Sequence, residues 1–119
     1  MIEALKREES GTRATVAWVL GDLKVADAAL PLMYALGNDT GPVRSAAARS
    51  LGEIRDLRSV DPLLDALRDE FSDVRLHAAW ALGELKDPRA ATPLSALNND
   101  PDPTVRRLAA EALKKLPQL

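Results

Sequence analysis

Residues 74–85 read Val-Arg-Leu-His-Ala-Ala-Trp-Ala-Leu-Gly-Glu-Leu, and they decide the fold because variants of this stretch recur along the chain. Its arginine and its Leu-Gly pair return every 31 residues, as does a proline in the stretch before the next copy. A fixed period of this length is typical of proteins built from stacked helical units. The columns are Arg13, Arg44, Arg75 and Arg106; Leu20, Leu51, Leu82 and Leu113; Gly21, Gly52 and Gly83; and Pro31, Pro62 and Pro93.

Each repeat predicts two helices. The first carries its proline near the start, where a missing N–H costs nothing, and a turn rich in Asn and Asp separates it from the second. The apolar stripe of one second helix, spaced for a helical period of about 3.6 residues, comprises Val43, Ala47, Leu51 and Ile54. Glycine inside a helix costs about 1 kcal/mol relative to alanine, so we expect Gly52 and its equivalents to allow close contact with the next unit.

The repeats therefore predict an all-α fold, an α-solenoid of about eight helices in one domain. We expect a partial repeat at 1–11, repeats at about 12–42, 43–73 and 74–103, and a final helix at 104–116. Leu97 follows Pro93 by four residues, whereas the corresponding spacing in the two preceding units is five. The first helix of the third unit is therefore expected to end early.

Composition excludes several classes of function. Sixteen Lys and Arg against eighteen Asp and Glu give a formal charge of −2, without the basic field that nucleic-acid binding requires. The chain has no cysteine, hence no disulfide and no thiol nucleophile. The first residues mix charge into every turn and no apolar run approaches membrane-spanning length. We expect a soluble protein of the reducing cytoplasm, with no nucleic-acid or membrane partner.

The Val-Arg pair, the paired alanines and the Ala-Leu-Gly ending resemble the HEAT-like repeats named after phycobilisome bilin lyases. The resemblance covers nearly the whole chain. It implies a right-handed superhelix of helical hairpins whose Val-Arg helices line a concave face. It also implies that each repeat arginine pairs with an acidic residue six positions earlier. Asp69 with Arg75 and Asp100 with Arg106 match this pattern; Asn38 precedes Arg44, and Arg7 precedes Arg13.

Two interpretations of the arginine column differ in function. Four guanidinium groups in a row could bind an anionic polymer such as nucleic acid. The acidic residues upstream of two of them, and the absence of net positive charge, favour structural pairing instead.

Signatures of catalysis and metal binding are absent from the sequence. His77 is the only histidine, and the nearest carboxylate on its own predicted helix, Glu84, is about two turns away, too far to share a metal. HEAT-like deoxyhypusine hydroxylases bind iron through His-Glu pairs, whereas here alanine follows His77. We expect no enzyme activity, no metal and no cofactor.

Trp18 and Trp80 occupy one repeat position, with Arg49 between them in the same column. This position lies about 140° from the apolar stripe, so the helix's own core does not explain either indole. Trp and Arg are enriched in interface hot spots, and we expect a protein or peptide partner to bind this row on the concave face. Flanking members of the predicted surface are Thr15, His77, Glu53 and Glu84.

Alternatives remain open at this stage. Each indole could instead fill space over small residues of a neighbouring helix. The acidic column of Asp22, Glu53 and Glu84 could be a solvated face or could select a basic partner. Family resemblance also suggests an accessory subunit of a tetrapyrrole lyase. Apolar residues near the ends, Met1, Leu5, Leu116 and Leu119, suggest self-association or a fragment of a longer solenoid.

Overall fold

The computed structural model describes residues 1–117, which form eight α-helices and no strand. The α-helices are α1 Ala4–Arg7, α2 Ser10–Asp22, α3 Ala29–Asn38, α4 Gly41–Ile54, α5 Val60–Ala66, α6 Ser72–Leu85, α7 Ala91–Ala96 and α8 Pro103–Lys115. Short 3₁₀ turns lead into α3, α5 and α7, and another follows α7: Ala26–Ala28, Leu57–Ser59, Pro88–Ala90 and Leu97–Asn99. The predicted all-α solenoid is confirmed.

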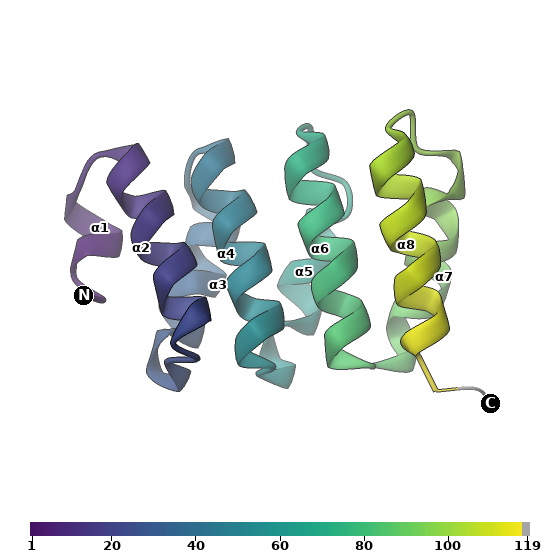
Figure 1. Cartoon of the computed structure of the whole chain (residues 1–119), viewed down its shortest axis with the longest axis horizontal. Coiled ribbons are helices and arrows are strands. Elements are labelled where there is room, and N and C mark those ends of the chain that lie inside the picture. Colours follow the sequence, from purple (N-terminus) through teal and green to yellow (C-terminus); the bar gives the residue numbers. More distant parts are fainter. Residues whose placement is uncertain (118–119) are drawn as a thin grey trace.

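The helices form two layers. Figure 1 shows α2, α4, α6 and α8 side by side in front, with α3, α5 and α7 behind them. We call α2, α4, α6 and α8 the even-helix layer. Within it α2 packs on α4, α4 on α6 and α6 on α8. The molecule as a whole measures 41 × 27 × 19 Å. Each unit therefore rests on its immediate neighbours, the defining property of a solenoid.

Small residues allow the even helices to approach closely. A Cβ added at Gly52 would lie 2.8 Å from the Cα of Ala81 on α6, and one at Gly83 would lie 2.9 Å from the Cα of Ala112 on α8. The glycine column therefore permits contact with the next unit, as predicted. Leu51 and Leu82 fill the core behind these contacts and are 0% exposed.

The ends of the helices follow local sequence signals. The helix α7 has only six residues before a 3₁₀ turn takes over, which confirms the early end predicted for the third unit. Of the apolar residues expected at the open ends, Leu5 and Leu116 are buried and Met1 is exposed, while Leu119 lies outside the described residues. Over residues 1–117, the helices are too short and too polar to cross a membrane.

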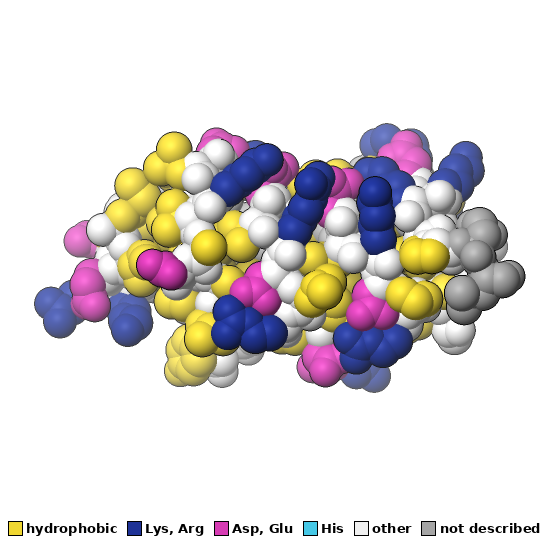
Figure 2. All heavy atoms as spheres, turned by 90° about the horizontal axis from the view of Figure 1, so that it is seen from below, with side chains coloured by type: hydrophobic (Ala, Val, Ile, Leu, Met, Phe, Trp, Pro, Cys, Tyr) yellow, Lys and Arg dark blue, Asp and Glu magenta, His cyan; other side chains and the backbone are white. Residues whose placement is uncertain are grey.

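Residues in the left-handed conformation follow α2, α4 and α6 and reverse the chain toward the second layer. They are Lys24, Arg55 and Lys86, with φ of 52°, 62° and 58°. After Arg55, the carboxylate of Asp56 accepts a hydrogen bond from the main-chain N–H of Arg58 at 2.9 Å and fixes the turn. Figure 2 views the molecule from below Figure 1, where the even helices end, and shows acidic and basic side chains interleaved along the length of the molecule.

Candidate functional site

The repeat arginines form a ladder of ion pairs between neighbouring units. Arg44 donates from Nε and Nη2 to the two carboxylate oxygens of Asp69, at 2.7 and 3.0 Å. This forked geometry fixes both side chains, so each pair ties an even helix to the turn that precedes the next one. Three pairs share it: Arg13–Asp39, Arg44–Asp69 and Arg75–Asp100.

The pairing with an acidic residue six positions earlier is therefore wrong. Asp69 and Asp100 do contact Arg75 and Arg106, but through their main-chain carbonyl oxygens, at 2.8 and 2.6 Å. The carbonyl at the end of the turn faces the following helix of its own unit, while the carboxylate extends to the arginine of the preceding unit. The first repeat is no exception to the ladder, because Arg13 pairs with Asp39.

The ladder lowers the pKa of its carboxyl groups. Hydrogen bonds from Arg13 hold the pKa of Asp39 below its usual value, against the opposing effect of burial. Burial alone would raise the pKa of Asp69 and Asp100, but hydrogen bonds from arginine and from the main chain outweigh it and keep the pKa of each low. The first three arginines are thus occupied by carboxylates, an arrangement that favours a structural role over binding an anionic polymer.

Trp18 lies on the outer surface of the even-helix layer and is 41% exposed. The guanidinium carbon of Arg49, on α4, is 4.0 Å from the centroid of the Trp18 ring. The His77 ring, on α6, meets the indole edge-on, with 6.1 Å between ring centroids and 83° between planes. The indole of α2 therefore reaches over α4 to α6, and the cation–π contact with Arg49 holds it there.

Trp80 occupies the same repeat position but is partly buried against the core. Its ring lies over Gly52 of α4, where an added Cβ would come 2.7 Å from Trp80 Cζ3. The helical angle predicts that both indoles point away from the core, and this is wrong for Trp80. The alternative, that an indole fills space left by a small residue on the neighbouring helix, describes this residue well.

Arg49 lies between the two indoles but is itself paired. Its Nη2 donates to the carboxylate of Asp22 at 2.5 Å, and its Nη1 donates to the main-chain oxygen of Trp18 at 3.1 Å. Glu53, one turn further along α4, is 4.0 Å away. The guanidinium group is consequently held in place against the Trp18 ring, and its charge is already paired with a carboxylate.

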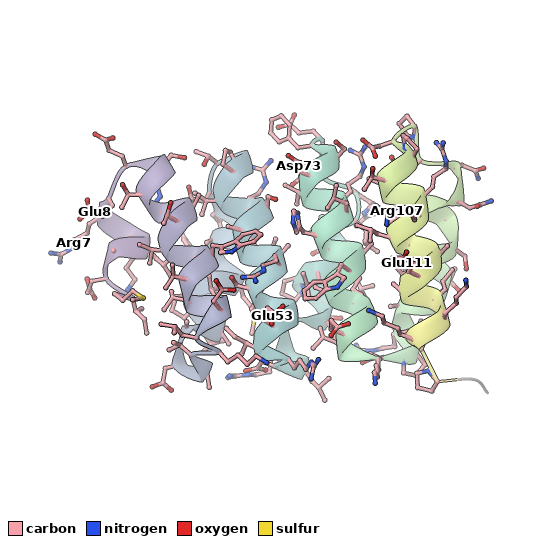
Figure 3. The ribbon with its side chains drawn as sticks, viewed as in Figure 1. Arg7, Glu8, Glu53, Asp73, Arg107 and Glu111 are labelled. Atoms are coloured by element: carbon pink, nitrogen blue, oxygen red, sulfur yellow. The ribbon has the colours of Figure 1, made fainter. Side chains whose placement is uncertain are left out.

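The predicted acidic column is largely matched by basic residues of adjacent units. Glu84 accepts hydrogen bonds from Lys115 at 2.7 Å and Arg55 at 2.8 Å, and with Lys115 as the larger influence these lower its pKa. Figure 3 shows Glu53 on α4, and further along the layer Arg107 and Glu111 on α8, which are 3.6 Å apart. The surface therefore carries mutually paired charges and little net field.

His77 is held by hydrogen bonds at one ring nitrogen. Nδ1 lies 2.7 Å from the main-chain oxygen of Asp73 and 3.0 Å from Oγ of Ser45 on α4. A carbonyl oxygen only accepts, so Nδ1 carries the proton that bonds Asp73, and in the neutral ring Nε2 is left as an acceptor. Thr15, also predicted here, donates its hydroxyl to the main-chain oxygen of Gly11 at 3.1 Å within its own helix.

Two hollows lie on the surface of the even-helix layer. The first, of about 350 Å³, lies between α2 and α4 and is bounded by Trp18. The second, of about 260 Å³, extends from α4 across α6 to α8 and is bounded by His77 and Trp80. The predicted residues Trp18, Thr15, Arg49, His77, Glu53 and Trp80 all line one hollow or the other, whereas Glu84 lines neither.

Sequence reasoning missed two residues of this region. Asp39 completes the first ladder pair, but a strict 31-residue register points to Asn38 beside it. Ser45 fixes His77, and no feature of the sequence distinguishes it from other helical serines. In the part of the chain that the structure describes, no three His, Asp or Glu side chains gather in a way that could hold a metal ion.

Comparison with solved structures gives a similar fold. The complex of CpcE and CpcF of phycocyanin lyase from Nostoc sp. PCC7120 contains a chain that matches with a TM-score of 0.80 and 24% sequence identity. The match covers 99% of this protein and 64% of that chain, so this protein spans less than two thirds of its length. No curated protein matches the sequence.

The family model for HEAT repeats matches residues 31–114. That stretch covers most of the chain, from the proline of α3 to near the end of α8. It includes three of the four repeat arginines and the whole of α4, α5, α6 and α7. The chain therefore belongs to the HEAT-repeat family.

Proposed function

We propose that this protein is a non-catalytic scaffold that binds a protein or peptide partner on the outer surface of the even-helix layer. The observation that carries the proposal is Trp18, a large indole that is 41% exposed and yet held in place by Arg49 and His77. A fixed aromatic side chain loses little conformational entropy when a partner covers it. Trp is also among the residues most enriched in interface hot spots.

Neighbouring residues would contribute in different ways. Trp80 offers its outer edge beside His77, while Arg49 would act mainly by fixing Trp18. Thr15 and Glu53 border the two hollows and supply polar contacts at the rim. Glu84, already bonded to Lys115 and Arg55, would contribute least. The proposed surface is thus centred on Trp18 and the two hollows and does not follow the whole repeat column evenly.

A pull-down from an extract of the source cells tests the proposal. The immobilised wild-type chain is compared with Trp18→Ala and with Tyr34→Ala, an exposed aromatic of α3 in the other layer. We expect a partner that wild type and Tyr34→Ala retain and Trp18→Ala loses. A partner that Trp18→Ala retains in full would place the binding surface elsewhere.

A second candidate is an accessory subunit of a tetrapyrrole lyase-type complex. The similarity in fold to a chain of the CpcE and CpcF complex favours it. Incubation with a free bilin, followed by absorbance spectroscopy, separates this function from general scaffolding. A red shift or narrowing of the bilin band upon addition of the protein would support it, and an unchanged spectrum would count against it.

A further inference from the structure

Apolar residues make up at least half of the lining of each hollow. Ala14, Val19, Pro42 and Ala46 line the first beside Trp18. Leu76, Trp80 and Leu108 line the second. Each hollow is large enough for one side chain of the size of leucine or phenylalanine, and neither is filled by the protein's own side chains.

The charges around the hollows select against a strongly charged occupant. Arg49 is bonded to Asp22, and Arg107 lies 3.6 Å from Glu111 on the far side of the second hollow. A charged occupant would lose hydration on this surface while the opposite charges beside it are already paired, which costs free energy. The complementary occupant is therefore an uncharged segment with two apolar side chains.

Helix spacing sets the distance between those side chains. The first hollow lies between α2 and α4, and the second is centred near α6, so they are separated by about one and a half interhelix distances, roughly 14 Å. An extended chain rises about 3.4 Å per residue and places alternate side chains on one face. Residues i and i+4 of an extended segment that crosses the helices would thus reach both hollows from the same face.

The residue between the two anchors would face His77. His77 lines the second hollow, and Ser45, to which its Nδ1 is bonded, lines the first. Because Nδ1 is bonded to Asp73, Nε2 of the neutral ring is an acceptor. The side chain at i+2 of the segment points the same way as the anchors and can supply the donor.

We infer that the partner presents an extended, uncharged segment with apolar side chains at i and i+4 and a hydrogen-bond donor at i+2. The inference rests on the proposed function, because it names the ligand of that same surface. Apolar contacts in the two hollows would supply the affinity, and His77 would set the register.

Two synthetic heptapeptides with blocked ends test the geometry. Both consist of two leucines, one threonine and four glycines. The first has leucines at positions two and six with threonine at four; the second moves one leucine to position five. The indole N–H signals of Trp18 and Trp80, the chain's two tryptophans, report separately on the two hollows in ¹⁵N–¹H correlation spectra.

The first peptide should shift both indole signals with a single dissociation constant. The second should bind about tenfold more weakly or worse, because burying one leucine is worth about 1.5–3 kcal/mol. Leu108→Asp should abolish the Trp80 response to the first peptide and weaken binding by a similar factor. A third peptide, with valine in place of threonine at position four, should bind wild type more weakly than the first. His77→Phe, which keeps an aromatic ring but removes Nε2, should remove this difference.

Equal binding of the two peptides, or a response at only one indole, would overturn the inference. These results are separable from a failure of the proposed function. If a cellular partner depends on Trp18 while neither peptide binds, the surface is an interface and the extended segment is wrong. If no partner depends on Trp18, the function itself fails.

Discussion

Trp18 and Trp80 occupy the same repeat position in units that are two periods apart, yet one is exposed and the other lies partly buried. Both lean toward α4, from opposite sides. The Trp80 ring lies over Gly52, where the absence of a side chain leaves space for the indole. Trp18 meets the long side chain of Arg49 and stays above it, 4.0 Å from the guanidinium carbon. The difference teaches that the facing residue on α4 decides whether an indole of this column becomes core or surface.

The largest expected effect concerns the core shared by both regions. Leu20→Ala beneath Trp18 and Leu82→Ala beneath Trp80 should each lower the free energy of unfolding by about 2–5 kcal/mol, because both leucines are fully buried. Leu51→Ala on α4 should lose a similar amount. Urea denaturation measures these values. Losses below about 1 kcal/mol at Leu51 and Leu82 would mean that the inner face is wrongly assigned.

Direct replacement of the indoles sharpens the comparison. Trp80→Ala should cost about 3 kcal/mol, because it leaves Gly52 facing an empty space. Trp18→Ala should cost less, about 1 kcal/mol, because this residue is 41% exposed and lies at the surface. Acrylamide quenching of each single-Trp variant provides an independent measure. If Trp18 proved as protected from quencher as Trp80, the proposed binding surface would lose its anchor.

Filling the space at Gly52 should disturb only the Trp80 region. Gly52→Ala places a methyl group 2.7 Å from Trp80 Cζ3 and 2.8 Å from the Cα of Ala81, and we expect a loss of about 2 kcal/mol from overpacking. Gly37→Ala is the matched control, since nothing lies within 4 Å of the added Cβ and alanine favours a helix. The control should be neutral or slightly stabilising. Equal losses would remove Gly52 as the cause of the difference.

The ion-pair ladder should contribute about equally to the stability of the Trp18 region and of the Trp80 region. Asp39→Asn in the Trp18 region and Asp100→Asn in the Trp80 region should each cost about 1 kcal/mol, the net value of a typical hydrogen-bonded pair. The lowered pKa of Asp39, Asp69 and Asp100 means that this stability is present above about pH 4, the pKa of an unfolded aspartate. It should be lost as the pH falls through the lower folded-state values.

Thermal melts between pH 6 and pH 2 measure this dependence. Wild type should lose stability in acid, and the Asp39→Asn/Asp100→Asn double variant should lose less over the same range. A double variant with the full acid dependence of wild type would show that other carboxylates, such as Glu84, carry it.

The repeat period predicts the helices well because it depends on spacing alone. The glycine contacts and the early end of α7 follow from the same columns. The ladder partners could not be obtained in this way, since Arg44 and Asp69 are 25 residues apart and join different units. The sequence pattern assigned each arginine to the acidic residue six positions earlier. That residue contacts the arginine only through its main-chain carbonyl oxygen. The direction of the backbone at the turn decides which arginine the carboxylate reaches, and the sequence does not reveal that direction.

The candidate site was only partly predictable for a similar reason. The helical angle of 18 and 80 relative to the core stripe is identical, so periodicity assigns both indoles the same exposure. Burial of Trp80 depends on Gly52 of another helix, and the orientation of His77 depends on Ser45 of that same helix. Lateral neighbours therefore determine the surface, whereas each helix's own pattern determines the core.

The glycine contacts of the even-helix layer make its units interchangeable modules. Gly21 faces Ser50 as Gly52 faces Ala81, and both facing residues are small. Excision of residues 40–70, one full period, would join Asp39 to Phe71 and set α2 directly beside α6. Arg13 would keep Asp39, and Gly21 would meet Ala81 in place of Ser50. The repeat architecture therefore predicts that a whole unit can be removed and that the contact surfaces of the remaining units still match.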